Sequence, residues 1–234
     1  MPPARLKETE AALKLTATAR AAESMIGETL VFGRYEQDNN LENGPEQIEW
    51  EVLEIEDNTA TLISKYGLDS VPYNEKLANV SWENCSLRAW LNGEFYEQAF
   101  NENEKSSIRI ESIPNESRKI EIGRTPVAYW WGTRWQMDYQ HDISNGKNTE
   151  ESVYVLDMKE YYKYSFSYSG PTAYAESKNL KKNRWGGTQW WLRTRVADKN
   201  NAFTNLIEHE GMSVNSQGIL IRPVIRINLD SIKN

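Results

Sequence analysis

Hydrophobic and polar positions change their period several times along the chain, and each period predicts an element. Apolar residues alternate with acidic ones through Ile48–Ile55, which is typical of a strand with one buried face. Strands are also expected at Leu30–Tyr35 and Thr59–Tyr66, and Asp57-Asn58 is a hairpin signal between the last two. The three strands predict an antiparallel meander.

The period then becomes helical. Leu87, Trp90 and Leu91 have i, i+3, i+4 spacing, and Asn92-Gly93 is expected to end that turn. Asn101 with Glu104 three residues later predicts a capping box for a second short helix.

The middle of the chain predicts shorter elements. Strands are expected around Ile108–Ile113, Ile120–Ile122 and Val153–Leu156, and a helix capped by Asp157 and Glu160 should run to about Tyr164. The polar stretch from Gln136 to Glu151 predicts an exposed insertion, and residues 165–183 predict a loop.

Two strand-like runs, Trp185–Arg193 and Ile221–Leu229, bracket a polar, asparagine-rich interval near the carboxyl end. Ile221, Ile225, Ile227 and Leu229 should share one face of the second run, and Arg222, Val224, Arg226 and Asn228 should take the other, as in a half-buried strand. Trp190 and Trp191 are adjacent in the first run, so only one of them can face a given core, and the other must cover a second layer or line a groove.

The pattern divides the chain into an N-terminal helical arm, residues 1–26, and one domain, residues 27–234. Leu6, Leu13 and Ala17 give the arm only a thin apolar stripe, so it should pack on the body, on a second copy, or on an upstream domain. Packing on the body is favoured.

Composition changes the picture mainly by excluding partners. A net charge of −7 disfavours nucleic acid as a general partner. Lys178, Lys181, Lys182 and Arg184 beside Trp185 form a basic and aromatic cluster, best interpreted as a solvated loop. The sequence shows neither a membrane span nor a signal peptide, so a cytoplasmic location is slightly favoured; surface display stays open if residues are missing upstream.

Little in the sequence predicts catalysis. Cys85 is the single cysteine, which excludes an internal disulfide and a cysteine-clustered zinc site, and a small buried thiol is expected. Two histidines are too few for a usual catalytic zinc, and neither a nucleophile elbow nor a phosphate loop is found. The Asp38–Glu46 loop has oxygens suited to calcium but lacks EF-hand spacing. We therefore expect no catalytic residue, no metal site and no cofactor.

Several motifs together resemble one uncharacterised bacterial domain family. Its pattern runs from a W-x-x-S/C-x-L-R-x-W-L-N helix through V-Y-V-L, T-x-Y-A and W-W-L-R to a late R-P strand. The matching segments here are Trp82–Asn92, Val153–Tyr161, Thr172–Ala175, Trp190–Arg193 and Arg222–Pro223. Thr194–Val196 and Leu220-Ile221 depart from the family's S-P-G and its glycine before R-P.

That family is similar to the C-type-lectin-like fold of formylglycine-generating enzymes and of the variable proteins of diversity-generating retroelements. The resemblance implies an α+β domain with small twisted antiparallel sheets, two main helices and long loops that display ligand-binding residues between W-W-L-R and R-P. The resemblance implies that the enzymatic branch uses a pair of active-site cysteines for its oxidation chemistry. This chain has one cysteine, so that branch is disfavoured.

The leading hypothesis is a non-enzymatic module that recognises a protein or glycan through that interval. The expected contact residues are Trp185, Trp191, Arg193, Asn201, Asn205, Glu208 and His209, with Trp130 and Trp131 as neighbours.

Two alternatives stay open. One is a hydrolase or transferase centred on His209 with Glu208 or Glu210. The other is a structural domain that oligomerises through the N-terminal helix.

Overall fold

The computed structural model shows a mixed α+β protein whose strands form small antiparallel sheets, as the sequence predicts. It describes residues 24–115, 117–122, 126–129, 132–135, 139–144, 146–164, 169–182, 186–197, 199–205 and 211–231. The predicted N-terminal helix lies outside the described residues. None of the helices in the described part of the chain combines the length and hydropathy that a membrane crossing needs.

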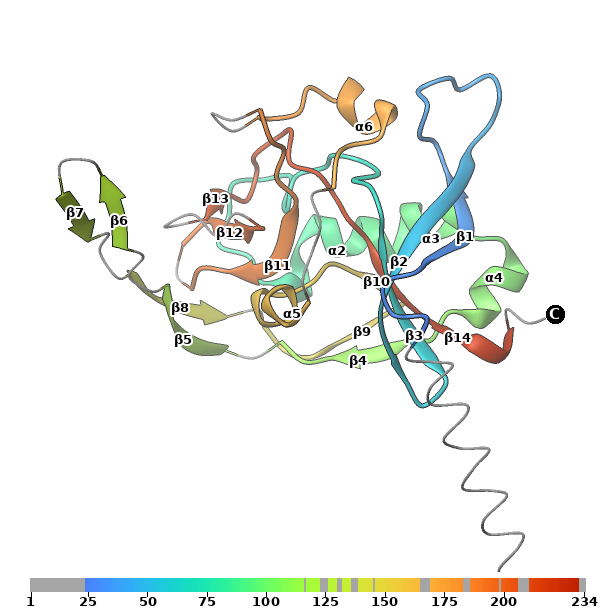
Figure 1. Ribbon diagram of the computed structural model, residues 1–234, viewed down its shortest axis with the longest axis horizontal. Helices are drawn as coiled ribbons and strands as arrows, with labels where there is room; N and C mark the ends of the chain where they lie inside the picture. The colour runs from blue at the N-terminus through green and yellow to red at the C-terminus, as the bar shows by residue number, and fades with distance from the viewer. Residues whose placement is uncertain are drawn as a thin grey trace, which may run out of the picture.

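A five-stranded antiparallel sheet forms the centre of the fold (Figure 1). Its order is β1, β2, β3, β14, β10, with bounds Thr29–Tyr35, Glu46–Glu56, Thr59–Ser64, Val224–Asn228 and Val153–Tyr154. The predicted meander is confirmed, and Asp57 and Asn58 both take positive φ in the β2–β3 turn. These are the angles that a two-residue turn of the primed type requires.

The last strand is inserted in the middle of this sheet. Strand β14 pairs with β3 from Val224–Ile63 to Asn228–Thr59, and with β10 on its other side. The predicted alternation is confirmed in part. Ile225 and Ile227 are fully buried while Arg226 and Asn228 are partly exposed, but Arg222 and Val224, expected on the half-exposed face, are buried as well. The carboxyl-terminal run therefore closes the sheet and brings its arginines against distant segments.

Short helices cover the face of the sheet that carries Trp50. They are η1 (Trp82–Asn84), α2 (Ser86–Trp90), η2 (Leu91–Phe95), α3 (Tyr96–Ala99) and α4 (Glu102–Ser107). Phe100, just after α3, stacks on Trp50 with ring centroids 6.3 Å apart, and the capping box of Asn101 and Glu104 is confirmed.

The prediction that Asn92-Gly93 ends the first helix is wrong. The chain passes through η2, a π-helical turn, and stays helical to Ala99. The amide of Asn92 bonds to residues some sixty positions away, so this residue is held by tertiary contacts and does not serve as a helix stop.

The opposite face of the sheet meets α5 (Met158–Lys163), whose Lys163 side chain bonds to Glu54 of β2. The fold also has a second, three-stranded sheet. That sheet is ordered β11 (Trp191–Arg195), β12 (Asn201–Thr204), β13 (Met212–Ser213). The Asp157–Glu160 capping box is confirmed. The V-Y-V-L strand is shorter than expected, and α6 (Ala173–Ser177), capped by Thr172, lies within the predicted loop.

Three further pairs of strands occupy the segment between α4 and β10, and Figure 1 shows two of them as an arm at one side. They are β4 (Glu111–Ile113) with β9 (Thr149–Glu151), β5 (Ser117–Ile122) with β8 (Tyr139–Ser144), and β6 (Pro126–Tyr129) with β7 (Gly132–Trp135). A 3-10 turn, η3 (Leu229–Ser231), follows β14.

The polar stretch from Gln136 to Glu151 is not wholly an exposed insertion. Ile143, Thr149 and Glu151 within it are buried. Strand β9 pairs with β4, so this end of the stretch belongs to the body of the fold, and a burial estimate from polarity alone is wrong there.

Candidate functional site

The last three residues of the W-W-L-R motif begin β11, whose five residues are all buried. Trp191 is 0% exposed, its indole Nε1 donates to the carbonyl oxygen of Val71 at 3.1 Å, and its ring meets the edge of Tyr73. The prediction that Trp191 contacts a ligand at the surface is wrong, because the polar handle of the ring is satisfied inside the protein.

Arg193 is also an interior residue, with 1% of its surface exposed. Its guanidinium donates to the carbonyl oxygen of Val155 and forms ion pairs with Asp157 and Glu160. Burial alone would lower the pKa of Arg193, but Glu160 and Asp157 outweigh it and raise that pKa. Its placement on a contact surface is therefore wrong: Arg193 fastens β11 to the start of α5.

The arginine of the R-P motif has a matching role. Arg222 is 1% exposed, lies 4.9 Å from the centre of the Trp190 ring, and donates from Nε to the carbonyl oxygen of Ser64. Burial lowers its pKa to about 10. Trp190 covers a second layer, as one of the alternatives for the tryptophan pair predicted, and Tyr161 packs edge-on against it at 6.1 Å.

The two predicted asparagines, one at the start of β12 and one just after its end, lie nearer the surface. Asn201 and Asn205 are both half-buried. Asn205 is anchored at both polar backbone atoms of Trp190, because its Oδ1 accepts from the Trp190 N–H at 2.9 Å and its own N–H donates to the Trp190 oxygen. Asn201 pairs with Ser213 across the sheet. Both positions are therefore partly exposed and held to neighbouring backbone by strand pairing or hydrogen bonds.

The remaining predicted site residues lie outside the described residues. They are Trp130, Trp131, Trp185, Glu208 and His209, together with Glu210 of the alternative active site.

A buried carboxylate missed by the sequence reasoning organises the first motif. Glu151, with 2% of its surface exposed, accepts hydrogen bonds from Trp82 Nε1 at 3.0 Å, Arg88 Nε at 2.5 Å and Asn92 Nδ2 at 2.7 Å. The Asn92 Oδ1 accepts the backbone N–H groups of Ser152 and Val153. We refer to Trp82, Arg88, Asn92 and Glu151 as the Glu151 cluster.

The Glu151 cluster explains why the first motif has its spacing. Arg88 and Asn92 are four residues apart, so they lie on one side of a helical turn and reach the same carboxylate. That i, i+4 pair of polar residues was the signal available in the sequence. Its partner, 59 residues further along, was not identifiable from spacing.

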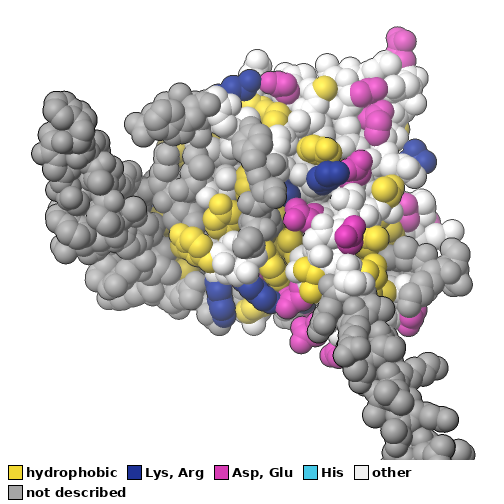
Figure 2. Space-filling view, viewed as in Figure 1, with side chains coloured by type: hydrophobic (Ala, Val, Ile, Leu, Met, Phe, Trp, Pro, Cys, Tyr) yellow, Lys and Arg dark blue, Asp and Glu magenta, His cyan; other side chains and the backbone are white. Residues whose placement is uncertain are grey.

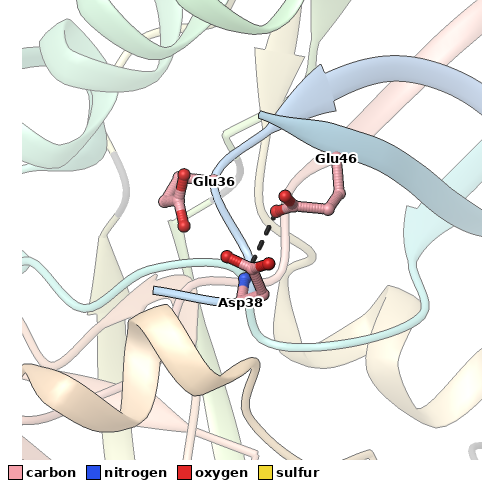
Figure 3. Close-up of side chains that lie close together, drawn as sticks. All are labelled: Glu36, Asp38 and Glu46. Atoms are coloured by element: carbon pink, nitrogen blue, oxygen red, sulfur yellow. Dashed lines mark hydrogen bonds between the residues drawn. The ribbon is translucent and has the colours of Figure 1, made fainter. Parts of the chain in front are cut away.

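The loop between β1 and β2 brings three carboxylates together. One oxygen each of Glu36, Asp38 and Glu46 lies within 4.8 Å of the others, and Figure 3 shows the Asp38 N–H bonded to the Glu46 carboxylate. Burial and the neighbouring Glu46 raise the pKa of Glu36. Hard cations such as calcium prefer such oxygens, so these residues are the described set that could hold one. In Figure 2 acidic side chains gather over this hairpin.

The fold and the sites above can be set beside known proteins. No curated protein and no solved structure matches the chain. A family model does match, over residues 57–229, under the description "Domain of unknown function (DUF6273)". The matched range includes both runs of the carboxyl-terminal third and the whole Glu151 cluster. The chain therefore belongs to the DUF6273 domain family.

Proposed function

We propose that this domain is a recognition module without catalytic chemistry. It binds a protein or glycan through the interval between β11 and β14 and the tyrosines of α5 that lie beside it. We refer to Asn201, Asn205, Tyr161 and Tyr162 as the recognition surface. Trp130, Trp131, Trp185, Glu208 and His209 stay in the proposal as neighbouring contacts.

One observation supports this choice more than any other: an exposed aromatic side chain stands on a fixed base. Tyr162 is 67% exposed. Its neighbour Tyr161 packs on Trp190, and a side-chain hydrogen bond links Tyr161 to Asn205. A rigid aromatic side chain gives much contact area at little cost in conformational entropy, which favours binding.

The interior position of the motif residues is consistent with the same function. Trp191, Arg193 and Arg222 are fixed by hydrogen bonds inside the fold, so they hold the recognition surface in one arrangement without touching the ligand. Preorganised side chains lose less entropy on binding.

The finer fold assignment is also part of the proposal. We infer a C-type-lectin-like fold from the order of the motifs, the small antiparallel sheets and the return of the last strand into the central sheet. An experimental structure would overturn it if β14 paired elsewhere than between β3 and β10.

The direct test probes a combined glycan and protein array with the labelled full chain. The variants are Tyr162→Ala and Asn201→Ala, and the matched control is Tyr66→Ala, because Tyr66 is another exposed tyrosine, on a different segment. Tyr162→Ala is expected to weaken binding at least ~10-fold, the size of an aromatic hot spot, while the control binds as wild type.

Three outcomes would contradict the proposal. They are the lack of any binder, equal binding by Tyr162→Ala and wild type, and equal loss in the control. Trp191→Ala is not a usable probe, because truncating a buried tryptophan costs about 3–5 kcal/mol of folding free energy.

Two further measurements test the alternatives. Chemical change of an array ligand that stops in His209→Ala would favour the hydrolase or transferase. Light scattering that shows an oligomer only when residues 1–26 are present would favour the assembly domain.

A further inference from the structure

A second buried carboxylate lies where β3 leaves the sheet. Asp69 is 5% exposed, and its two oxygens accept from the Tyr35 hydroxyl at 2.6 Å and from the Ser70 N–H at 2.6 Å. Its backbone is fixed to the approach to β14, because the Ile221 N–H donates to the Asp69 carbonyl oxygen at 2.8 Å. The carboxylate therefore has a defined position and direction.

The charge of Asp69 has no close cation in the described part of the chain. No described lysine or arginine nitrogen lies within 4.0 Å of its oxygens, and both donors to the carboxylate are neutral groups. An ionised carboxylate offers about four acceptor positions, so two remain after these hydrogen bonds. Burying such a charge without an ionic partner is unfavourable, and a cation that reached it would relieve that cost.

Two further aromatic rings pack on Tyr35, whose hydroxyl holds this carboxylate. The Tyr35 ring meets Phe95 at 5.1 Å and the edge of Tyr174 at 6.0 Å. Tyr174 belongs to α6 and is half-buried, and its backbone N–H donates to the Gln37 carbonyl oxygen. Ring faces attract cations, so a carboxylate held by Tyr35, with Tyr174 packed on that ring, has the chemistry that organic cations prefer.

The chain already places one ammonium at the outer side. Lys178 is exposed, its Nζ lies 4.4 Å from the centre of the Tyr174 ring, and it donates to the Tyr174 hydroxyl at 2.9 Å. That hydrogen bond is the largest cause of a raised Lys178 pKa, and the charges of Asp69 and Glu94 add to it. The Lys178 ammonium therefore lies against the Tyr174 ring, and no described ion pair joins it to Asp69.

We propose that Tyr35, Asp69, Tyr174 and Lys178, here the Asp69 cluster, bind an alkylammonium group, and that Lys178 is its intramolecular competitor. An entering ammonium displaces the exposed Lys178 side chain, lies against Tyr174 and reaches the free acceptor positions of Asp69. This cluster shares no residue with the recognition surface, so the proposal does not depend on the proposed function.

The experiment titrates the full chain with n-butylammonium chloride and follows its amide proton–nitrogen spectrum. The Ser70 N–H reports directly, because it donates to Asp69. Ionic strength is matched with sodium chloride, and 1-butanol serves as the neutral analogue of the same length. We expect a saturable Ser70 shift with the amine and none with the alcohol.

Three variants make the test specific. Lys178→Met keeps the length of the side chain but removes the competing charge, so it should bind the amine roughly 10-fold more tightly. Asp69→Asn should abolish binding. Lys182→Met is the matched control, because Lys182 is a nearby exposed lysine paired with Glu176, and it should bind as wild type.

Any of three results would overturn the proposal: no gain in Lys178→Met, full binding in Asp69→Asn, or an equal shift with 1-butanol. If Asp69→Asn does not fold, Tyr174→Leu replaces it. Unchanged amine binding in Tyr174→Leu would also overturn the proposal.

Two arms distinguish the source of the ammonium. The free amine is compared with an acetylated and amidated Gly-Lys-Gly peptide. Tighter binding of the peptide identifies a lysine side chain of a partner protein, and tighter binding of the free amine identifies a small amine. A failure of both overturns the proposal, while the array result for Tyr162→Ala is unaffected.

Discussion

Glu151 and Asp69 are both carboxylates enclosed by the protein, and the chain compensates their charges differently. Glu151 accepts from the guanidinium of Arg88 and from two neutral donors, so its charge is balanced inside the fold. Asp69 accepts from a hydroxyl and a backbone N–H. The first arrangement is what a structural joint needs, and the second leaves capacity for a ligand.

The comparison separates motif residues that build the frame from residues that can act. Trp82, Arg88 and Asn92 belong to the first motif, within the range that the family model matches, and all three donate to Glu151. Tyr174 belongs to another motif, T-x-Y-A, yet it faces a lysine at the surface. Membership in a motif therefore does not by itself assign a residue to binding.

The largest expected effect is at the Glu151 cluster. Glu151→Gln removes the charge that balances Arg88, and we expect a loss of about 3 kcal/mol in the free energy of unfolding. Urea denaturation measures it. Glu97→Gln, which breaks the surface pair with Lys105, should cost under about 1 kcal/mol. Equal losses in both variants would remove the distinction.

Loss of the neutral donor Asn92 should give the next largest decrease in the free energy of unfolding. Asn92→Ala deletes hydrogen bonds to Glu151, Ser152 and Val153, and we expect a loss of about 2 kcal/mol, measured by the same denaturation. Gln98→Ala is the matched control, because its amide bonds only the exposed Glu94 in the described structure. A cost for Asn92→Ala no larger than the control's would contradict the inference that Asn92 holds the cluster together.

Asp69→Asn should behave unlike Glu151→Gln. The amide oxygen of the asparagine can accept from the Ser70 N–H, and the Tyr35 hydroxyl can rotate to accept from the new NH2. The substitution also removes a charge that has no close cation, so stability should change by less than about 1 kcal/mol. Thermal and urea unfolding both measure it. A loss as large as that of Glu151→Gln would mean that Asp69 is compensated in a way the described contacts do not include.

A half-exposed carboxylate supplies the smallest effect. Burial opposes ionisation of Glu54, but hydrogen bonds from Lys163 and Tyr164 outweigh it and lower the pKa of Glu54 below its ordinary 4.5. Folded Glu54 thus binds a proton more weakly than unfolded Glu54. Its contribution is present above about pH 4.5 and is lost as the pH falls through the folded pKa.

Glu54→Gln should therefore flatten the acid side of the stability curve by about 0.5 kcal/mol and leave its shape above pH 6 unchanged. Urea midpoints from pH 3 to 7 check this. A steeper acid limb in the variant would reverse the assigned direction.

Much of the local structure followed from short-range rules. Alternation located β1, β2, β3 and β14, the Asp57-Asn58 pair located a hairpin, and two capping boxes located α4 and α5. Cys85 was expected as a small buried thiol and is 2% exposed, and burial raises its pKa to about 12. These features depend on residues within a few positions of each other, so a single sequence contains the information.

The candidate site followed less well, because exposure is a property of distant partners. Trp191 and Arg193 were expected at the surface, and hydrogen bonds to Val71 and Val155 place them inside. Asn92 was predicted to end a helix, but its side-chain amide donates to Glu151 and to the Val153 carbonyl oxygen. Polar residues were predicted to be solvent-exposed wherever their hydrogen-bond or ionic partner lay far along the chain.

The sequence by itself determined β1, β2, β3 and β14, two helix caps and the family motifs, since each is encoded by spacing over a few residues. Only the tertiary structure decided which polar groups are enclosed, which arginines are neutralised, and which carboxylate keeps unused acceptors. The physical reason is that burying a polar group is favourable only beside its partner. Partners 59 to 120 residues away meet only when the sheet closes around β14.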